Sequence, residues 1–145
     1  MADRVIGVDV GGTNLRAAAV DASGDIACRH EVRTPASAGP QAVVDALLKL
    51  AEEAAIEAGL PAGAPLGIAI PGPLDPATGV VAFTPNLTDW RDFPLGEALR
   101  RRTRRPFRLA NDGNCAAVGE ARFGVGRGIE DLIYLALGTG VGGGV

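Results

Sequence analysis

The chain has 145 residues, a length that allows one domain or two small lobes. With 47% hydrophobic and 21% charged residues, its composition is that of a folded globular protein and excludes a disordered chain. The net charge of −3 provides no positive field to attract nucleic acid, and no apolar run reaches the roughly 20 residues of a membrane helix. No leader precedes the first predicted strand, so we expect a cytoplasmic protein.

Cysteine and histidine are too few for two common kinds of site. The two cysteines, Cys28 and Cys115, lie far apart, which excludes a disulfide framework and suits a reducing compartment. The only histidine is His30, so we expect no complete zinc site in this chain. Cys28 and His30 are two residues apart on a predicted strand and therefore face the same side of it. We interpret both as packing residues and not as metal ligands.

The first part of the chain predicts an antiparallel meander followed by a helix. Three apolar runs separated by glycine turns are typical of strands: 4–10, 15–22 and 26–33. Within residues 41–58, apolar residues instead recur every three or four positions, which predicts an amphipathic helix.

The rest of the chain predicts alternating strands and helices. The expected elements are a strand at 66–70, a loop-rich stretch at 72–92 with a small hairpin at Thr78-Gly79, a helix at 94–103 with Pro94 in its first turn, a strand at 107–110, a helix from 111 or 112 to about 123, and strands at 132–137 and after 140. Together with the meander, this order predicts an α/β fold.

Two segments share one plan, namely an apolar strand, a turn of glycine and threonine, and a new strand. They are IGVDVGGTNLRAA at 6–18 and LIYLALGTGVGGGV at 132–145. A duplicated fold would begin its second copy near residue 130. Because the chain then stops inside a predicted strand, we expect it to be a fragment of a longer protein.

The first strand ends in Asp9-Val10-Gly11-Gly12-Thr13-Asn14. Two glycines at a strand-to-strand turn allow the backbone to approach a ligand closely, and successive N–H groups in such a turn form a nest for anions. Thr13 and Asn14 add side-chain donors. Asp9 could hold Mg²⁺ through water, because that ion keeps much of its hydration shell. The alternative is an ordinary hairpin turn with a solvated aspartate.

A second glycine-rich turn is Gly138-Thr139-Gly140-Val141-Gly142-Gly143-Gly144. The entropy cost of ordering so many glycines makes an ordinary strand a poor explanation. The spacing also fits the dinucleotide fingerprint, but that motif needs a following helix, and Val141 onward is predicted as strand. A Walker A loop is excluded because the only lysine, Lys49, lies in the predicted helix.

Asn111-Asp112-Gly113-Asn114 follows a predicted strand and opens a helix, at the sheet edge where ligands tend to bind. An aspartate here could accept a hydroxyl proton, an effect worth about 10²–10⁴ in rate. The alternative is a helix N-cap, the usual role of such residues. A cap needs only one of them, so the three polar residues together favour a functional site.

Two loops with proline residues are PGPLD at 71–75 and TPNLTDW at 84–90, and the second carries the amide of Asn86. Amide groups and a tryptophan ring suit sugar recognition, although the loop taken alone favours a rigid turn with Trp90 anchored in the core. The arginine-rich run 100–105, with Arg108, would allow nucleic-acid binding. We favour a solvated helix face balanced by acids elsewhere.

These segments together resemble one family. VIGVDVGGTNLRAA is similar to the first phosphate motif of the superfamily of sugar kinases, actin and heat-shock chaperones. With IAIPGPLDPATGVV, FTPNLTDWRDFPL, ANDGNCAAVGEARFGVGRG and LIYLALGTGVGGGV, it resembles the ROK (repressor, open reading frame, kinase) family, and within it the bacterial glucokinases. The five motifs follow the family's order and span nearly all of the chain.

The resemblance implies an α/β fold of the ribonuclease-H-like, actin-like ATPase type. Residues 1–110 would form a complete first lobe, and residues 111–145 the start of a truncated second lobe. The implied activity is ATP-dependent phosphorylation of a hexose, in the first place glucose to glucose 6-phosphate, with ATP and Mg²⁺ as cofactors. A structural zinc site is implied only for a segment beyond residue 145. The full-length relative would be a cytoplasmic enzyme of glycolysis and a homodimer, with no nucleic-acid or membrane partner.

The resemblance also implies a role for single residues. Asp112 matches the catalytic aspartate, which takes the proton from the sugar's primary hydroxyl as it attacks the γ-phosphate. The implied sugar ligands are Gly72, Asn86, Asn111 and Asp112. Asp9, Gly11, Gly12 and Thr13 match the first phosphate loop, to which we add Asn14, and Gly138, Thr139 and Gly140 match the second. Gly113 stands where an alanine is common, at some cost in helix propensity.

Two alternatives to a kinase are a sugar-responsive transcriptional regulator of the same family and a non-catalytic nucleotide- or sugar-binding protein. Only three residues precede Arg4, which leaves no room for a DNA-binding helix-turn-helix. The sugar-loop motif at 84–93 disfavours a chaperone- or actin-like scaffold. We expect the 145-residue chain by itself to be inactive.

Overall fold

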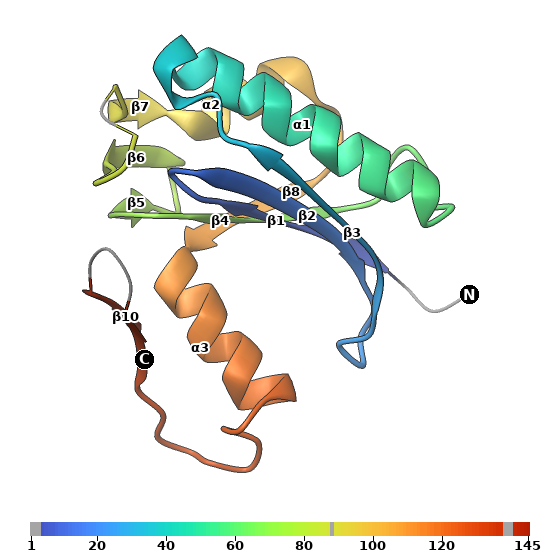
Figure 1. Ribbon diagram of the computed structural model, residues 1–145, viewed down its shortest axis with the longest axis vertical. Helices are drawn as coiled ribbons and strands as arrows, with labels where there is room; N and C mark the ends of the chain where they lie inside the picture. The colour runs from blue at the N-terminus through green and yellow to red at the C-terminus, as the bar shows by residue number, and fades with distance from the viewer. Residues whose placement is uncertain (1–3, 88, 138–140) are drawn as a thin grey trace.

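The centre of the fold is a five-stranded sheet in the order β3-β2-β1-β4-β8 (Figure 1). The computed structural model describes residues 4–87, 89–137 and 141–145. The strands are β1 (Val5–Val10), β2 (Asn14–Val20), β3 (Ile26–Arg33), β4 (Leu66–Ile70) and β8 (Phe107–Asn111). The antiparallel pairs β1–β2 and β2–β3 confirm the predicted meander, and β4 and β8 extend the sheet in parallel.

Helix α1 (Pro40–Glu57) covers one face of this sheet, and helix α3 (Asp112–Phe123) lies on the opposite side (Figure 1). Side chains alternate along β1, β2 and β4, and every second residue is buried. These buried residues form a core with the apolar side of α1, the helix that the sequence period predicted. The largest fully buried side chains of these four elements are Ile6, Leu15, Leu47, Leu50, Ile68 and Ile70.

The other face of the sheet carries small residues, among them Gly7, Ala18, Gly67 and Ala69. Such side chains cannot fill the space up to α3, so a cavity of about 500 Å³ remains on this side. Cys115 of α3 and the side chains of Asp9 and Arg16 line it as well.

A separate three-stranded sheet contains the predicted hairpin at Thr78-Gly79. It has the order β5-β6-β7, formed by β5 (Leu74–Asp75), β6 (Val80–Phe83) and β7 (Arg91–Pro94). The Thr78 hydroxyl and the Ala77 N–H donate to the Asp75 carboxylate at 2.8 and 2.9 Å, which lowers the pKa of Asp75. Strand β7 had been expected as loop. Helix α2 (Leu95–Arg102) follows it directly, so Pro94 is the N-cap of the helix and does not lie in its first turn.

The chain closes with a hairpin of β9 (Tyr134–Leu137) and β10 (Val141–Gly144). It packs against α3, on the side away from the large sheet (Figure 1). The strand predicted from 132 thus begins two residues later, at Tyr134. A short 3₁₀ helix, η1 (Ala36–Ala38), was not expected and leads into α1.

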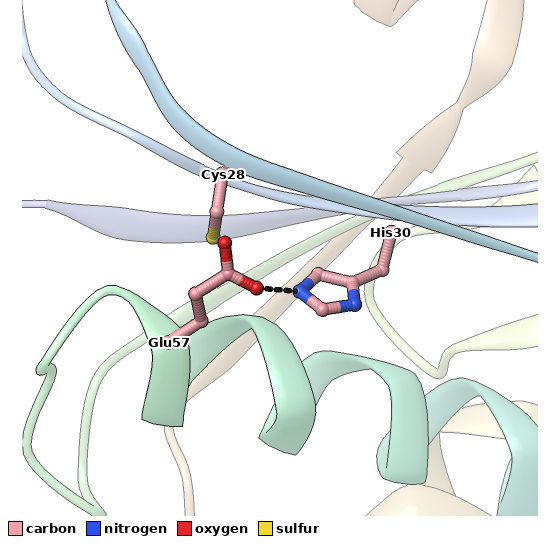
Figure 2. Close-up of side chains that lie close together, drawn as sticks. All are labelled: Cys28, His30 and Glu57. Atoms are coloured by element: carbon pink, nitrogen blue, oxygen red, sulfur yellow. Dashed lines mark ion pairs between the residues drawn. The ribbon is translucent and has the colours of Figure 1, made fainter.

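Strand β3 forms one edge of the large sheet and packs against the C-terminal half of α1. Cys28 is 7% exposed, and its thiol donates to the carbonyl oxygen of Ala54 at 3.3 Å. His30 lies on the same side of the strand and faces Glu57, the last residue of α1 (Figure 2). The interpretation of Cys28 as a packing residue fits its burial.

Three arginines of the arginine-rich run pair with acidic residues, and one of these three is not solvated. Arg101 pairs with Glu97, and Arg102 Nε lies 2.8 Å from Asp45 Oδ1. Arg105 follows the helix and is 8% exposed. Its guanidinium donates to Glu52 and to two backbone carbonyls, so it belongs to the packed part of the fold.

Among the described residues, no helix has both the length and the apolar character to cross a membrane.

Candidate functional site

The N-terminal end of α3 positions Asn111 and Asp112. Asn111 ends β8 and caps the helix, because its Oδ1 accepts the Asn114 N–H at 3.2 Å. Its Nδ2 donates to the Gly72 carbonyl at 3.1 Å. Asp112 is exposed, and its Oδ1 accepts the Gly113 N–H at 2.8 Å, which orients the carboxylate. The positive end of the helix dipole favours a negative charge at this position.

Gly72 forms the wall beside Asn111. Its φ of +89° lies in the region that favours glycine, and a Cβ here would lie 2.2 Å from the Phe83 carbonyl oxygen. The backbone of Gly72 can therefore lie between β6 and the Asn111 side chain only because it has no side chain itself. The amide of Asn111 keeps one further N–H and one further lone pair for a ligand.

A cavity of about 780 Å³ opens in front of these residues. Gly72, Asn86, Asn111 and Asp112, the four predicted sugar-binding residues, all line it. Phe83 and Leu137 provide apolar surface, and the backbone of Gly142 and Gly143 forms part of the opposite wall. The structure thus brings together residues that are up to 40 positions apart in the sequence (72 to 112) around one space of the size of a small ligand site.

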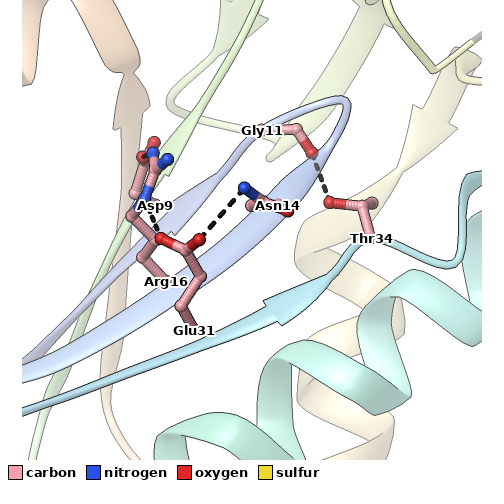
Figure 3. A network of polar contacts seen from close by, with 6 residues as sticks. All are labelled: Asp9, Gly11, Asn14, Arg16, Glu31 and Thr34. Carbon is pink, nitrogen blue, oxygen red and sulfur yellow. Dashed lines mark hydrogen bonds and ion pairs between the residues drawn. The ribbon is translucent and has the colours of Figure 1, made fainter.

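The predicted first phosphate loop is a tight turn between β1 and β2. The Gly11 N–H donates to the Asn14 carbonyl at 3.0 Å, and a Cβ on Gly11 would lie 2.7 Å from that oxygen. The Thr34 hydroxyl donates to the Gly11 carbonyl at 2.6 Å (Figure 3). The Thr34 N–H donates to the Thr13 carbonyl at 2.8 Å, so Thr34 holds the turn at two points. The Thr13 side chain remains exposed.

Asp9 takes part in a network of charged side chains (Figure 3). Arg16 donates to Asp9 at 3.2 Å and to Glu31 at 2.6 Å, and Asn14 donates to the other carboxylate oxygen of Glu31 at 3.1 Å. The hydrogen bonds that Arg16 donates, first to Glu31 and then to Asp9, raise the pKa of Arg16 above its usual value. Asp9 lines the 500 Å³ cavity, not the 780 Å³ one, although it remains partly exposed.

Gly12 connects this turn to the predicted sugar loop. A Cβ on Gly12 would lie 2.3 Å from the Cβ of Asn86, so the two backbones are in direct contact. The Asn86 loop is itself fixed by the buried hydroxyl of Thr84, which donates to the Leu87 carbonyl at 2.9 Å. The first phosphate loop and one wall of the 780 Å³ cavity therefore share a boundary.

The second predicted phosphate loop is only partly described. Gly138, Thr139 and Gly140 lie outside the described residues. The strands on either side are described, and their residues Leu137 and Val141 line the cavity with Asp112. This hairpin rests on α3 through glycines, because a Cβ on Gly113 would lie 2.3 Å from the Gly143 carbonyl oxygen.

Cys115, in the first turn of α3, lines the 500 Å³ cavity together with Asp9. Burial raises the pKa of the Cys115 thiol, and the negative charges of Asp112 and then Asp9 add to this effect. The Cys115 thiol is therefore within electrostatic reach of both Asp112 and Asp9.

Sequence reasoning missed Arg16, Glu31, Thr34 and Cys115, since their contribution depends on neighbours across the sheet. Arg16 could have been found, because the predicted hairpin places it opposite Asp9. Trp90 does not line the 780 Å³ cavity. It is 2% exposed and packs against Phe93 with ring centroids 4.9 Å apart, so it anchors the loop in the core.

Comparison with known proteins gives the same family over the whole site. Residues 5–145 match the ROK family. A glucokinase of Streptomyces coelicolor is 41% identical over 140 residues, which are 97% of this chain and 42% of that protein. The chain thus spans less than half the length of this curated relative.

Solved structures agree with this match. A ROK family glucokinase from Streptomyces griseus, in complex with glucose and AMPPNP, superposes with a TM-score of 0.86 at 39% identity, over 97% of this chain and 43% of that one. An inorganic polyphosphate/ATP-glucomannokinase from Arthrobacter gives a TM-score of 0.87 at 33% identity, over 97% and 56% of the two chains. The mixed α/β fold is that of ROK glucokinases, the actin-like ATPase fold. On sequence and on structure alike, the chain belongs to the ROK family.

Proposed function

We propose that this chain carries the sugar-binding and proton-accepting half of a ROK hexose kinase, with glucose as its first substrate. The observation that carries the proposal is the position of Asp112. Asp112 lies at the N-terminal end of α3 and lines the 780 Å³ cavity, which Gly72, Asn86 and Asn111 also line. An exposed carboxylate beside amide and carbonyl groups suits a polyhydroxylated ligand with one reacting hydroxyl.

The chemistry assigned to these residues is positioning and proton transfer. Asn111 and Asn86 would donate hydrogen bonds to ring hydroxyls and accept hydrogen bonds from them. Asp112 would take the proton of the sugar's primary hydroxyl as the oxygen of that hydroxyl attacks the γ-phosphorus. The Gly113 N–H holds one oxygen of Asp112, which leaves the second for that proton. Phosphoryl transfer depends mainly on positioning and charge stabilisation. These residues would contribute the positioning of the sugar and the acceptance of its proton.

The first loop fits a nucleotide phosphate with Mg²⁺, which supplies charge neutralisation when bound. The turn of Gly11 and Gly12 is tight and lacks side chains that would hinder a phosphate oxygen. Asp9 is partly exposed, and Arg16 engages only one of its oxygens, Oδ2. The other oxygen suits a water of a hydrated Mg²⁺ better than direct coordination, because Arg16 already neutralises much of the carboxylate's charge.

The substrate and the donor follow the relatives. The glucose complex of the Streptomyces griseus relative supports glucose, and the name of the Arthrobacter relative adds mannose as a second sugar and polyphosphate as a second donor. The test is a chimeric kinase, in which residues 1–145 replace the matching part of the Streptomyces coelicolor glucokinase. We expect glucose-dependent ADP release from the chimera and none from the 145-residue chain alone.

Asp112→Asn in the chimera keeps the shape of the side chain and removes the base. We expect kcat to fall by about 10²–10⁴ with little change in the KM for glucose. Asp131→Asn, in an exposed position of the loop before β9, is the matched control and should leave kcat unchanged. Turnover of the Asp112 variant within a few-fold of the parent would contradict the assigned base. Glucose binding without any turnover would instead favour a sugar-responsive regulator.

A further inference from the structure

We propose that Cys28, His30 and Glu57 form a binding site for a thiophilic divalent metal ion, with zinc as the best-suited ion. In the described parts of the chain, this is the single group of three or more Cys, His, Asp or Glu residues close enough to share an ion. None of the three lines the 780 Å³ cavity, so the site is separate from the proposed kinase chemistry. It would fasten the end of α1 to the edge strand β3.

The geometry is close to that of a metal centre. Cys28 and His30 project from the same side of β3, and Glu57 reaches between them from the last turn of α1 (Figure 2). One possible ligand atom of each residue lies within 4.8 Å of the others. A tetrahedral zinc ion with bonds of about 2.0–2.3 Å places its ligand atoms roughly 3.3–3.8 Å apart. Glu57 is 60% exposed in its side chain and can make the small adjustment needed.

The donor set selects the class of ion. Thiolate, imidazole and carboxylate together are ligands of zinc, whereas Mg²⁺ and Ca²⁺ take oxygen ligands only. Three protein ligands leave the fourth tetrahedral position to water. Because β3 is the edge of the sheet and Glu57 is exposed, solvent can reach that position.

Two further observations indicate that a cation belongs here. The Nε2 atom of His30 lies 2.8 Å from Glu57 Oε2, a contact that is an ion pair only when the imidazole carries a charge (Figure 2), and this buried atom has no hydrogen-bond partner among the described residues. In addition, α1 ends with an acidic residue and has no basic residue in its last turn. The negative end of a helix dipole beside a carboxylate is stabilised by a positive charge.

Binding would leave no buried group unsatisfied. The Cys28 thiol must lose its proton to bind a metal, and with it the hydrogen bond to the Ala54 carbonyl. That carbonyl already accepts the Ala58 N–H at 3.1 Å, so it keeps a partner. The nearby apolar core around Ala54 and Ala55 would exclude water from the sulfur side of the ion.

The chain contains one histidine and two cysteines, so few other side chains can compete for the metal in a binding test. The untagged chain is titrated with Zn²⁺ in competition with a chromophoric chelator, with Mg²⁺ as a comparison. In parallel, Co²⁺ is added to observe thiolate-to-cobalt charge-transfer absorption. We expect one equivalent of Zn²⁺ to bind, no competition from Mg²⁺, and a rise in Tm on Zn²⁺ addition that EDTA reverses.

Ligand variants and matched controls decide the outcome. Cys28→Ala should remove the charge-transfer band, and His30→Gln and Glu57→Gln should each weaken Zn²⁺ binding at least tenfold, because even groups that only support a ligand are worth about 10–100-fold. The Glu57 side chain lies on the surface, so we expect the Glu57→Gln variant to keep the fold, which circular dichroism would verify. Cys115→Ser and Glu53→Gln, one turn before Glu57, should bind like the parent. Binding that survives Cys28→Ala, or that Cys115→Ser abolishes, would overturn the proposal, as would the absence of stoichiometric binding.

Discussion

Gly113 and Gly143 are in contact through their backbones, so closely that a Cβ on Gly113 would lie 2.3 Å from the Gly143 carbonyl oxygen. The contact is reciprocal one residue further on, where a Cβ on Gly144 would lie 2.2 Å from the Gly113 carbonyl oxygen. The first turn of α3 and strand β10 therefore approach each other only because Gly113 on the helix and Gly143 and Gly144 on the strand lack side chains. This approach places the hairpin wall of the cavity opposite Asp112.

Gly113→Ala is expected to destabilise the chain even though alanine favours helices. The added methyl group overlaps a backbone carbonyl, and relieving an overlap of this kind typically costs about 1–3 kcal/mol. Gly119→Ala is the matched control on the same helix, since a Cβ at Gly119 meets nothing within 4 Å. It should gain up to about 1 kcal/mol from helix propensity alone. The free energy of unfolding in urea measures both changes, and equal gains would show that the glycine contact does not exist.

Gly72→Ala is expected to reduce both stability and sugar affinity. Gly72 combines a φ of +89° with a Cβ position 2.2 Å from the Phe83 carbonyl oxygen. Gly128→Ala measures the cost of the positive φ alone, because Gly128 has a φ of +80° and open space around it. We expect a loss of about 1 kcal/mol at Gly128 from backbone strain and a clearly larger loss at Gly72. Glucose titration by calorimetry in the chimera should show weaker binding for the Gly72 variant only.

Arg105→Met is expected to cost about 1–3 kcal/mol of stability, since it leaves the buried Ala64 carbonyl without the donor that Arg105 provides. Arg105 donates to the carbonyls of Pro61 and Ala64 at 3.3 and 3.1 Å, and to Glu52. Arg101→Met breaks an exposed ion pair on α2 and should cost at most about 0.5 kcal/mol. Urea unfolding with an unchanged m-value measures the difference. Similar losses in the two variants would contradict a structural role for Arg105.

The thiol of Cys115 should report the charge on both aspartates. Its pKa is raised by burial and by the negative charges of Asp112 and Asp9, so little thiolate exists at pH 8. Asp112→Asn or Asp9→Asn removes one of these charges, which lowers the thiol's pKa toward its usual value and increases the thiolate fraction. Alkylation by iodoacetamide at pH 8 should therefore be faster in each variant. Cys28→Ala serves as the background, and unchanged rates would place Cys115 away from the two carboxylates.

Local signals in the sequence predicted most of the large sheet and α1, because glycine turns and apolar periodicity act within a few residues. Strand β3 has its predicted bounds, Ile26–Arg33, and α1 is displaced by one residue from the predicted 41–58. Strand β7, Arg91–Pro94, was missed because its charges and proline are typical of loops. It exists through pairing with β6, a contact that no local pattern shows.

Residues of the candidate site that stand in linear motifs could be predicted, whereas those that depend on contacts between elements could not. Asn111, Asp112, Gly72 and Asn86 stand in linear motifs that could be recognised one at a time, and the fold places them around one cavity. The partners of Asp9 could not be recognised so directly, because Arg16 reaches it only through the register of β1 with β2. The same holds for Glu57, whose position beside Cys28 and His30 depends on how α1 packs on β3.

Trp90 is the chain's single tryptophan, and its ring lies in the core beneath the loop that carries Asn86. The indole emission therefore comes from one known place and needs no engineered label. A shift of that emission to longer wavelength would mark the moment when this loop leaves the core. Comparison with far-UV circular dichroism, which is dominated by the helices, would then show whether this loop leaves the core together with global unfolding or before it.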